Sequence, residues 1–352
     1  MRVLHLISSS GVYGAEKMVV GLCEALPRFG VHPTLEVFDN AHSRNIEVAD
    51  YALTFGVPVK LLPCGGRFDA AAVRRLRRDI RDLNIDLVHT HGYKANLYGF
   101  FATRGGVPMV ATNHRFDTGP QNRFDKPVLR RAAAVFAVSD EARDSLRREY
   151  GITDAITIPN GVDPSGFDDS RPTLDLPRPL VGMVARLAPE KAPADFLAAA
   201  AAFPEATFVV VGDGPLRGEL EQAATANVHF LGFRDDMPGV YASLDVLVQP
   251  SYREGMPMTI LEAMSAGVAV VASRVGAAGD VIIDGRTGVL YAPGDVPSLI
   301  EAVRDLLGDE ARRAAIGKAA REAVAAQFTV DETARRYAEQ YRRVLGRDDG
   351  SR

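Results

Sequence analysis

The stretch VLVQPSYREGMPMTILEAMSAGVAVVAS, residues 246–273, contains one complete strand–loop–helix–strand unit. Its parts are expected at Val246–Gln249, Tyr252–Pro257, Met258–Ala266 and Val268–Ala272. A helix that begins beside the carboxyl end of a strand directs unpaired backbone N–H groups toward that edge of the sheet. Glu254 lies before the helix and Glu262 about one turn into it. The two acids are therefore placed to bracket a ligand whose phosphate binds at the helix start.

Short apolar runs alternate with helical periods along the whole chain, which predicts parallel sheets covered by helices on both faces. In the first half, strands are expected at Arg2–Ile7, Thr34–Phe38, Val59–Leu62, Leu87–Thr90, Met109–Thr112, Val135–Val138 and Ala155–Ile158. Further strands are expected at Leu180–Ala185, Thr207–Val211 and Val228–Leu231, and late helices at Val296–Leu307, Glu310–Gln327 and Val330–Leu345.

The alternation is interrupted by DPSGFDDSRPTLDLPRP, residues 163–179, whose proline, aspartate and serine content is typical of a linker. A chain of 352 residues is also too long for one ordinary core. The sequence thus predicts two doubly wound α/β domains, 1–170 and 171–329, facing across a cleft. Ligands bind such sheets outside the carboxyl ends of the strands.

Charge and composition argue against several classes of protein. A net charge of −4 makes a general nucleic-acid partner improbable, and no uninterrupted apolar run is long enough to span a membrane. The N-terminal apolar run is expected to be a strand, not a signal peptide. Cys23 and Cys64 have neither metal-ligand spacing nor a disulfide framework, so a reducing cytoplasm is expected.

Two segments near the start of the chain end strands with residues suited to binding. In SSSGVYGAEK, residues 8–17, Gly11 and Gly14 allow a tight turn close to a ligand, although an ordinary strand-to-helix turn has the same composition. In VHTHGYKAN, residues 88–96, His89 and His91 point the same way by strand alternation. The pair is open to two interpretations, metal binding or one histidine that contacts a substrate hydroxyl; His114 ends the next strand and is a candidate neighbour.

Two segments of the second half repeat this arrangement. VGMVARLAPEK, residues 181–191, carries Arg186 and Lys191 after a strand. Two cations there would hold a diphosphate without a metal ion, whereas either residue alone is expected to be a solvated surface charge. VVVGDGPLRGEL, residues 209–220, places Gly212 in a turn that enters a helix.

Together these segments resemble the retaining glycosyltransferases of family 4, which have the GT-B fold of two Rossmann-like domains. The resemblance covers nearly the whole chain. Its most specific part is the E-x7-E element formed by Glu254 and Glu262. It is supported by GAE at 14–16, IPNGVD at 158–163, ARLAPEK at 185–191, VGDGP at 211–215 and the final helix at 330–346, which is expected to pack back on the first domain.

The resemblance implies a role for each matching residue. Glu262 would bind the ribose hydroxyls of a sugar nucleotide, and Glu254 the hydroxyls of its sugar. Arg186 and Lys191 would neutralise the departing diphosphate. The donor site would also include Gly14, His114, Gly212, Gly255 and the helix start Met258, Thr259 and Ile260. His91 would face the reacting carbon.

The resemblance implies no cofactor beyond the donor, and the sequence contains no Asp-x-Asp element, which agrees with metal independence. Three positions depart from the usual family pattern: Ala185 before the arginine, Gly-Met-Pro at 255–257, and Asp280 where glutamate is usual. These departures bear on which sugar nucleotide is the donor. Two other functions remain open, a sugar-nucleotide epimerase of the same fold and a non-catalytic sugar-nucleotide-binding protein.

The acceptor is expected to bind the first domain and to be a glycan, a lipid-linked molecule or a small molecule. Residues 60–150 hold 17 Lys and Arg against 10 Asp and Glu. Five arginines crowd one predicted helix, Arg74, Arg75, Arg77, Arg78 and Arg81. Such a face suits either solvent or an anionic membrane, so peripheral contact with the inner face of the cytoplasmic membrane is an open expectation.

Overall fold

A computed structural model of the chain describes residues 1–9, 11–41, 45–66, 68–114 and 122–347. The chain divides into two compact units. Unit 1 comprises Met1–Gly161 and Val330–Arg352, and unit 2 comprises Val162–Thr329. The expected linker therefore belongs to unit 2, and the division falls before it.

Unit 1 contains a seven-stranded parallel sheet in the order β3-β2-β1-β4-β5-β6-β7. Its strands are β1 (Arg2–Ile7), β2 (His32–Asn40), β3 (Val59–Cys64), β4 (Leu87–His91), β5 (Met109–Asn113), β6 (Ala134–Ala137) and β7 (Ile156–Thr157). Its helices are α1 (Gly14–Ala25), α2 (Glu47–Thr54), α3 (Ala70–Asp82), α4 (Tyr93–Thr103), α5 (Asn122–Leu129), α6 (Asp140–Ser145) and α14 (Val330–Val344). This is the doubly wound architecture that the alternation of the sequence predicts.

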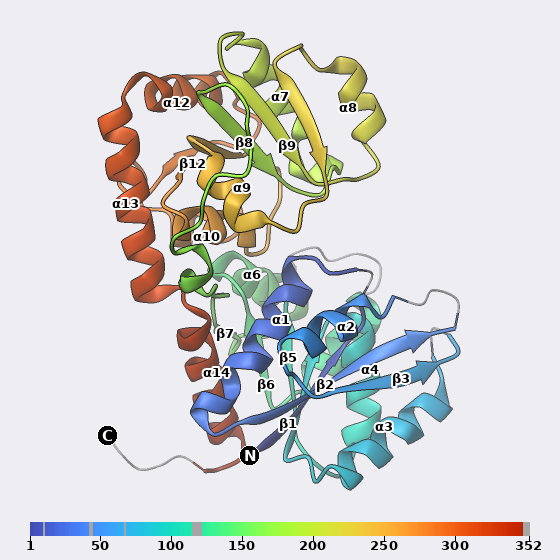
Figure 1. The fold of residues 1–352 in the computed structure, drawn as a ribbon. Coiled ribbons are helices and arrows are strands. Elements are labelled where there is room, and N and C mark those ends of the chain that lie inside the picture. Colours follow the sequence, from blue (N-terminus) through green and yellow to red (C-terminus); the bar gives the residue numbers. More distant parts are fainter. Residues whose placement is uncertain (10, 42–44, 67, 115–121, 348–352) are drawn as a thin grey trace. The chain divides into compact units, whose positions relative to one another are not determined.

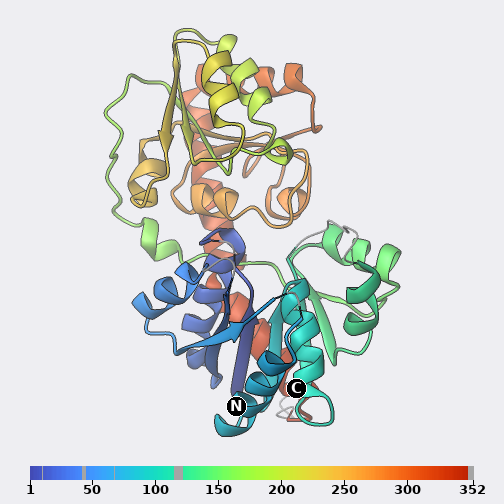
Figure 2. The same cartoon turned by 90° about the vertical axis from the view of Figure 1, so that its right-hand side faces the viewer.

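Alternation along β1 explains how the sheet is covered. Leu4 and Leu6 pack with α3 and α4 in one core. His5, which points to the other face, lies against Tyr341 of α14, with ring centroids 6.4 Å apart. Figures 1 and 2 show α14 lying beside α1, so the two ends of the described chain meet on one face of this sheet.

Unit 2 contains a six-stranded parallel sheet in the order β10-β9-β8-β11-β12-β13. Its strands are β8 (Leu180–Val184), β9 (Thr207–Val211), β10 (Val228–Gly232), β11 (Val246–Gln249), β12 (Ala269–Ser273) and β13 (Val289–Tyr291). Its helices are α7 (Pro193–Ala201), α8 (Arg217–Ala223), α9 (Met237–Ser243), α10 (Met258–Ser265), α11 (Ala278–Val281), α12 (Val296–Gly308) and α13 (Glu310–Gln327).

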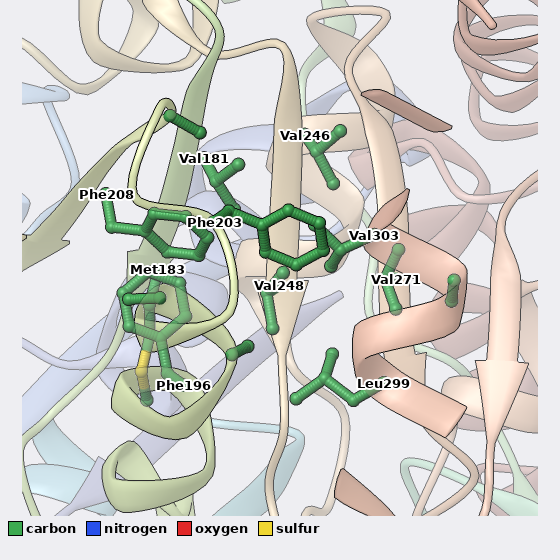
Figure 3. Close-up of a cluster of buried hydrophobic side chains, with 14 of the residues drawn as sticks. Val181, Met183, Phe196, Phe203, Phe208, Val246, Val248, Val271, Leu299 and Val303 are labelled. Atoms are coloured by element: carbon green, nitrogen blue, oxygen red, sulfur yellow. The ribbon is translucent and has the colours of Figure 1, made fainter. Parts of the chain in front are cut away.

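The core of unit 2 joins β8, β9 and β11 to α7 and α12 (Figure 3). Phe196 of α7 and Phe208 of β9 meet edge to face with ring centroids 5.3 Å apart, and both are fully buried. Burial of a side chain of this size contributes about 1.5–3 kcal/mol. This core fixes the strands whose carboxyl ends carry the polar residues described below.

Both sheets change winding direction once, between β1 and β4 in unit 1 and between β8 and β11 in unit 2. At such a switch point the loops after the two strands diverge and leave a crevice. The glycine loop and the His89–His91 segment follow β1 and β4, and the Arg186 and Glu254 loops follow β8 and β11. Each unit therefore brings its candidate residues to its own switch point.

The expected linker is ordered against unit 2. The backbone amides of Thr173 and Leu174 both donate to the hydroxyl of Ser243, at 2.9 and 3.0 Å. Thr173 also contacts Gly239, where an added Cβ atom would lie 2.3 Å from the threonine methyl group. A composition typical of a linker here forms a strap that packs along α9.

Candidate functional site

Two loops meet at the switch point of unit 2. The first follows β8 and ends in a short 3-10 turn at Pro189–Lys191, and the second follows β11 and leads into α10. The amide of Tyr252 donates to the carbonyl of Glu190 at 2.9 Å. The backbone itself therefore holds the two loops together and brings Lys191 to Glu254.

Glu254 is the centre of this meeting point. Its side chain is buried, and its carboxylate accepts from Lys191 Nζ at 2.6 and 2.7 Å. Gln249 Nε2 and Ser251 Oγ donate to the same Oε1 at 2.7 and 2.6 Å. Such partners are needed because burial of a carboxylate without hydrogen bonds costs free energy. Sequence reasoning selected Lys191 and Glu254 but not Gln249 and Ser251, which are unremarkable residues of a strand end.

Gln249 also connects the cluster to α10. Its side-chain carbonyl accepts from Thr259 Oγ1 at 3.2 Å. In the described part of the chain no side chain caps this helix. The amide of Ile260 already donates to the carbonyl of Pro257 at 3.1 Å. Of the three amides expected to contact a phosphate, those of Met258 and Thr259 therefore remain candidates.

Glu262 projects from the second turn of α10 and is half-buried. The hydroxyl of Tyr241, which is fully buried on α9, donates to Glu262 Oε2 at 2.6 Å. Burial and then the neighbouring carboxylate raise the pKa of Tyr241 well above its ordinary value, so it remains a hydrogen-bond donor. One carboxylate oxygen is thereby fixed, and the other is available to a ligand.

Arg186 is exposed and pairs with Glu190 at 2.6 Å. The two cations predicted to bind a diphosphate thus lie on one loop, and each is held by a carboxylate, Arg186 by Glu190 and Lys191 by Glu254. Exposed pairs contribute little to stability, so the Arg186 pair can be exchanged for a ligand at low cost.

Two glycines permit the close approach of these loops. Gly212 has a φ of +125°, and a Cβ atom there would lie 2.0 Å from the carbonyl oxygen of Ala185. Gly276 has a φ of +55°, and a Cβ atom there would lie 2.4 Å from the carbonyl oxygen of Glu254. Sequence reasoning selected Gly212 but overlooked Gly276. The turn at Gly276 also receives Gly255, whose carbonyl accepts from the amide of Ala277 at 2.9 Å.

In unit 1 the glycine loop leads into α1. Gly14 is the first residue of this helix, and the amide of Tyr13 donates to Glu16 Oε2 at 3.2 Å. Gly11 carries the left-handed backbone, with a φ of +147°. The loop therefore turns at Gly11, while Gly14 starts the helix.

Three histidines form a hydrogen-bonded chain at the switch point of unit 1. His91 Nε2 lies 3.1 Å from His5 Nδ1, and His91 Nδ1 lies 3.0 Å from His114 Nε2. His5 is fully buried, His91 is 3% exposed and His114 is half-buried. The predicted proximity of His91 and His114 is present. His5 was overlooked, although parallel pairing of β1 with β4 places it opposite His89.

His89 belongs to a separate set of contacts. Its Nδ1 lies 2.6 Å from the hydroxyl of Tyr341 and its Nε2 lies 2.7 Å from Thr112 Oγ1. Burial lowers the pKa of His89 and His91 well below the ordinary value and that of His5 to about 3, so all three are neutral at pH 7.

A metal ion is the alternative occupant of this region, because ligand atoms of His5, His89 and His91 lie within 4.8 Å of one another. Both nitrogens of His89 and both of His91 already have hydrogen-bond partners within the unit. A metal would have to displace them. The donor set fits a hydrogen-bonded network better than a metal centre.

Comparisons with known proteins decide the family. A model described as Glycosyltransferase Family 4 matches residues 12–165, and one described as Glycosyl transferases group 1 matches residues 178–309. The 2-deoxystreptamine N-acetyl-D-glucosaminyltransferase of Streptomyces fradiae is 32% identical over 309 residues, which are 75% of this chain and 72% of that protein. The chain belongs to the family 4 glycosyltransferases.

Another relative of this family 4 glycosyltransferase is the 2-deoxystreptamine glucosyltransferase of Streptomyces kanamyceticus. It is 34% identical over 243 residues, which are 62% of this chain and 63% of that protein. The aligned part thus falls just short of two thirds of that relative.

The fold of this family 4 glycosyltransferase is GT-B. The solved structure of HepE from Anabaena in complex with UDP has a TM-score of 0.84, with 23% sequence identity, and covers 97% of this chain and 99% of HepE. Among the helices that the structure describes, none combines the length and apolar composition needed to cross a bilayer.

Proposed function

We propose that this protein transfers a hexose-type sugar, with retention of configuration and without a metal ion, from a nucleoside-diphosphate sugar to a hydroxyl group of an acceptor. The observation that carries the proposal is the cluster at the start of α10. Glu254, Lys191 and Glu262 lie at the switch point of the unit 2 sheet, next to helix amides suited to a phosphate.

Each group has a role that its contacts support. Glu262, fixed on one side by Tyr241, offers its second oxygen to the two ribose hydroxyls. Glu254 reads hydroxyls of the sugar. Because Lys191 and Gln249 both donate to this carboxylate and fix its position, it suits hydrogen-bond acceptance.

Charge stabilisation supplies the rate enhancement in this proposal. As the bond between sugar and diphosphate breaks, negative charge builds on the diphosphate while the sugar becomes oxocarbenium-like. Arg186, Lys191 and the amides of Met258 and Thr259 neutralise the diphosphate. The proposal gives His91 and His114 the role of hydrogen-bonding a sugar hydroxyl.

We take the donor nucleotide to be UDP, because HepE is described in complex with UDP. The acceptor is a glycan, a lipid-linked molecule or a small molecule, in cell-surface polysaccharide or glycolipid biosynthesis. Relatives that act on 2-deoxystreptamine support a polyhydroxylated small molecule as one acceptor to include in the tests.

The experiment is a panel of UDP-, GDP- and ADP-sugars, each incubated with the protein and EDTA, with and without acceptors. Release of nucleoside diphosphate that depends on an acceptor, together with an α-configured product from an α-configured donor by proton NMR, is the expected result. Conversion of the donor to another sugar nucleotide without acceptor would indicate an epimerase. Donor binding with no turnover across the panel would indicate a binding protein, and loss of turnover in EDTA would contradict metal independence.

We also propose that unit 1 contacts an anionic membrane from the cytoplasmic side. On α3, Arg74, Arg78 and Arg81 are exposed. The adjacent Phe68 is 55% exposed, with its ring 5.5 Å from that of Phe101. Arginines beside an exposed aromatic ring favour a surface that is both anionic and apolar.

Co-sedimentation with vesicles tests this contact. At low salt the protein is expected to sediment with phosphatidylglycerol vesicles and not with phosphatidylcholine vesicles, because each basic residue near an anionic surface contributes about 1 kcal/mol. Replacement of Arg74, Arg78 and Arg81 by Gln should release it, whereas Arg312→Gln in unit 2 should not. Equal sedimentation with both lipids, or with neither, would contradict the contact.

A further inference from the structure

The salt bridge between Lys191 and Glu254 joins two loops that are anchored separately. Glu254 is fixed from its own strand end, because Gln249 and Ser251 donate to its carboxylate at 2.7 and 2.6 Å. Among the described residues, the ammonium of Lys191 hydrogen-bonds only to the two oxygens of Glu254. The geometry of the pair therefore depends on the contacts that hold the two loops together.

The loop that carries Lys191, residues 185–192, is attached on its other side to β9. The amide of Leu187 donates to the carbonyl of Asp213, which follows β9, at 2.9 Å. The salt bridge of Arg186 with Glu190 lies within the loop itself. Neither contact reaches the loop that carries Glu254.

Tyr252 connects the two loops through both its backbone and its side chain. Its amide donates to the carbonyl of Glu190 at 2.9 Å, and its hydroxyl donates to Asp195 Oδ1 at 3.0 Å. These two acceptors lie on either side of Lys191 along the chain. Among the described residues, the other hydrogen bonds between 190–195 and 250–257 are those of the Lys191 salt bridge and a longer one from the Arg253 amide, at 3.4 Å.

Asp195 is a buried acid on the first turn of α7. It is 8% exposed, and its Oδ2 has no hydrogen-bond partner among the described residues. Burial of a carboxylate with so few partners costs free energy, so its bond to Tyr252 calls for an explanation. An acid in the first turn also interacts favourably with the helix dipole. Support of α7 alone is therefore the alternative that an experiment must exclude.

The surroundings of Tyr252 keep its hydroxyl available as a donor. Its ring is 46% exposed and lies beside Gly294, where an added Cβ atom would be 3.7 Å from Cε1 of the ring. The hydrogen bond to Asp195 raises the pKa of Tyr252 above its ordinary value, so the hydroxyl remains protonated at neutral pH. Because the ring is half exposed, the hydroxyl can be removed without disturbing the core.

We propose that Tyr252 and Asp195 are positioning residues whose hydrogen bond holds the Lys191 ammonium against Glu254. Both act through Lys191 and neither contacts the donor. Without this bond the backbone contact at Glu190 remains, but the part of the chain between Lys191 and α7 loses its tie to the Glu254 loop. The ammonium then spends part of its time away from the carboxylate.

This inference rests on the proposed function for its purpose. In that proposal Lys191 neutralises negative charge that grows on the diphosphate as the sugar departs. The attraction between two charges falls as their separation grows, so an ammonium that is not held in place stabilises the departing group less well. The hydroxyl of Tyr252 would then affect the rate of transfer from outside the donor site.

The direct test is NMR spectroscopy of the full chain labelled with ¹⁵N in lysine, recorded at mildly acidic pH and low temperature without any sugar nucleotide. Ammonium protons give a proton–nitrogen correlation when a hydrogen bond slows their exchange with water. The wild type is expected to show this signal for Lys191, identified by its loss in Lys191→Arg. The ammonium of Lys60, which pairs with Asp79 in unit 1, is the internal reference. A Lys191 ammonium that exchanges without protection in the wild type would overturn the proposal.

Variants of the two positioning residues give the matched comparison. Tyr252→Phe is expected to raise the exchange rate of the Lys191 ammonium protons at least about fivefold and to leave Lys60 unchanged. Asp195→Ala should have the same effect, and the double variant should add nothing, because either change breaks the same bond. Asp195→Asn keeps an acceptor oxygen and should resemble the wild type.

Tyr291→Phe is the control for loss of a hydroxyl near Asp195. Tyr291 is 6% exposed and its hydroxyl has no hydrogen-bond partner among the described residues. Burial and then the charge of Asp195 raise its pKa, which places it close to this acid. The variant should leave the Lys191 signal unchanged, and an effect equal to that of Tyr252→Phe would overturn the proposal.

Three further results would overturn the positioning role. They are an unchanged Lys191 signal in Tyr252→Phe, effects that add in the double variant, and a lowered Tm in Asp195→Ala with no change at Lys191. If transfer is measured, Tyr252→Phe should lower kcat about tenfold with a smaller change in donor KM, because the charge on the diphosphate is largest in the transition state. If the donor panel shows no transfer, the spectra of Tyr252→Phe and wild type still decide whether Tyr252 positions Lys191.

Discussion

Glu254 illustrates how a residue of this protein acquires its role from its contacts. Lys191, Gln249 and Ser251 all donate to its carboxylate, which is 6% exposed as a residue. Lys191 donates to both carboxylate oxygens, which fixes the group in place. Its fixed acceptor oxygens suit the recognition of sugar hydroxyls, which the proposed function assigns to it.

Glu36 on β2 leads to a prediction about pH. It is fully buried, and burial, followed by the nearby carboxylate of Asp79, raises its pKa from 4.5 to about 8 against the opposing charge of Lys60. The folded protein thus holds a proton that the unfolded chain releases near pH 4.5. The stability from this group is complete below that pH and is lost as the pH rises through about 8.

Glu36→Gln should remove this loss. Relative to the wild type, the free energy of unfolding of the variant should rise between pH 5 and pH 9, by a few kcal/mol at most. Urea unfolding at several pH values measures the difference, and the exposed Glu47→Gln is the control. A difference between Glu36→Gln and wild type that does not change with pH would show that Glu36 is ionised in the folded protein at neutral pH.

At the residue scale the sequence identified the charges but not their partners. Glu254, Glu262, Arg186 and Lys191 follow from motif spacing. Tyr241 could not be found, because it lies in α9, and only the packing of α9 on α10 brings its hydroxyl 2.6 Å from Glu262. Hydrogen-bond partners that depend on tertiary packing leave no periodic signal in the chain.

At the scale of elements, the turn at Gly276 supports the loop that carries Glu254. Its left-handed backbone and the close carbonyl of Glu254 exclude a side chain there. Gly285 has a similar φ of +74°, but an added Cβ atom would meet nothing within 4 Å. A side chain at Gly285 would have only the cost of the left-handed backbone. A side chain at Gly276 would have that cost and the cost of contact with the Glu254 loop.

Gly276→Ala should destabilise unit 2 and weaken donor binding, because the new methyl group displaces the backbone of Glu254. Gly285→Ala should cost only about 1–2 kcal/mol of unfolding free energy and leave donor affinity unchanged. Thermal unfolding and calorimetric titration with UDP measure the two effects. Equal donor affinity in both variants would show that the turn at Gly276 does not support the donor site.

Elements were predictable where they are long and apolar. The sequence located β8, β9 and β11 to within a residue, because buried parallel strands form continuous apolar runs. It did not identify β13, which has three residues, and β7 has two residues where four were expected. The strap at 163–179 was expected to be a linker, because its contact with Ser243 uses backbone amides, which composition does not reveal.

At the scale of the whole molecule, the two units carry different sets of candidate residues. The phosphate and ribose candidates all belong to unit 2, while the histidine chain and the basic face of α3 belong to unit 1. Both chain ends contribute to unit 1, since α14 returns to pack on α1. A change within the donor site is therefore expected to alter donor affinity without altering the fold of unit 1.

The central claim is that Glu262 and its neighbours bind the donor nucleotide, and calorimetric titration of UDP into the full chain tests it most directly. Glu262→Ala should weaken UDP binding at least about tenfold, the effect of losing one hydrogen bond to a charged group. Glu262→Gln, which keeps an acceptor for Tyr241, separates this loss from misfolding, and Glu301→Ala on α12 is the control. Retained affinity in Glu301→Ala and a marked loss in both Glu262 variants is the predicted result. An unchanged affinity in Glu262→Ala would contradict the assignment of the site.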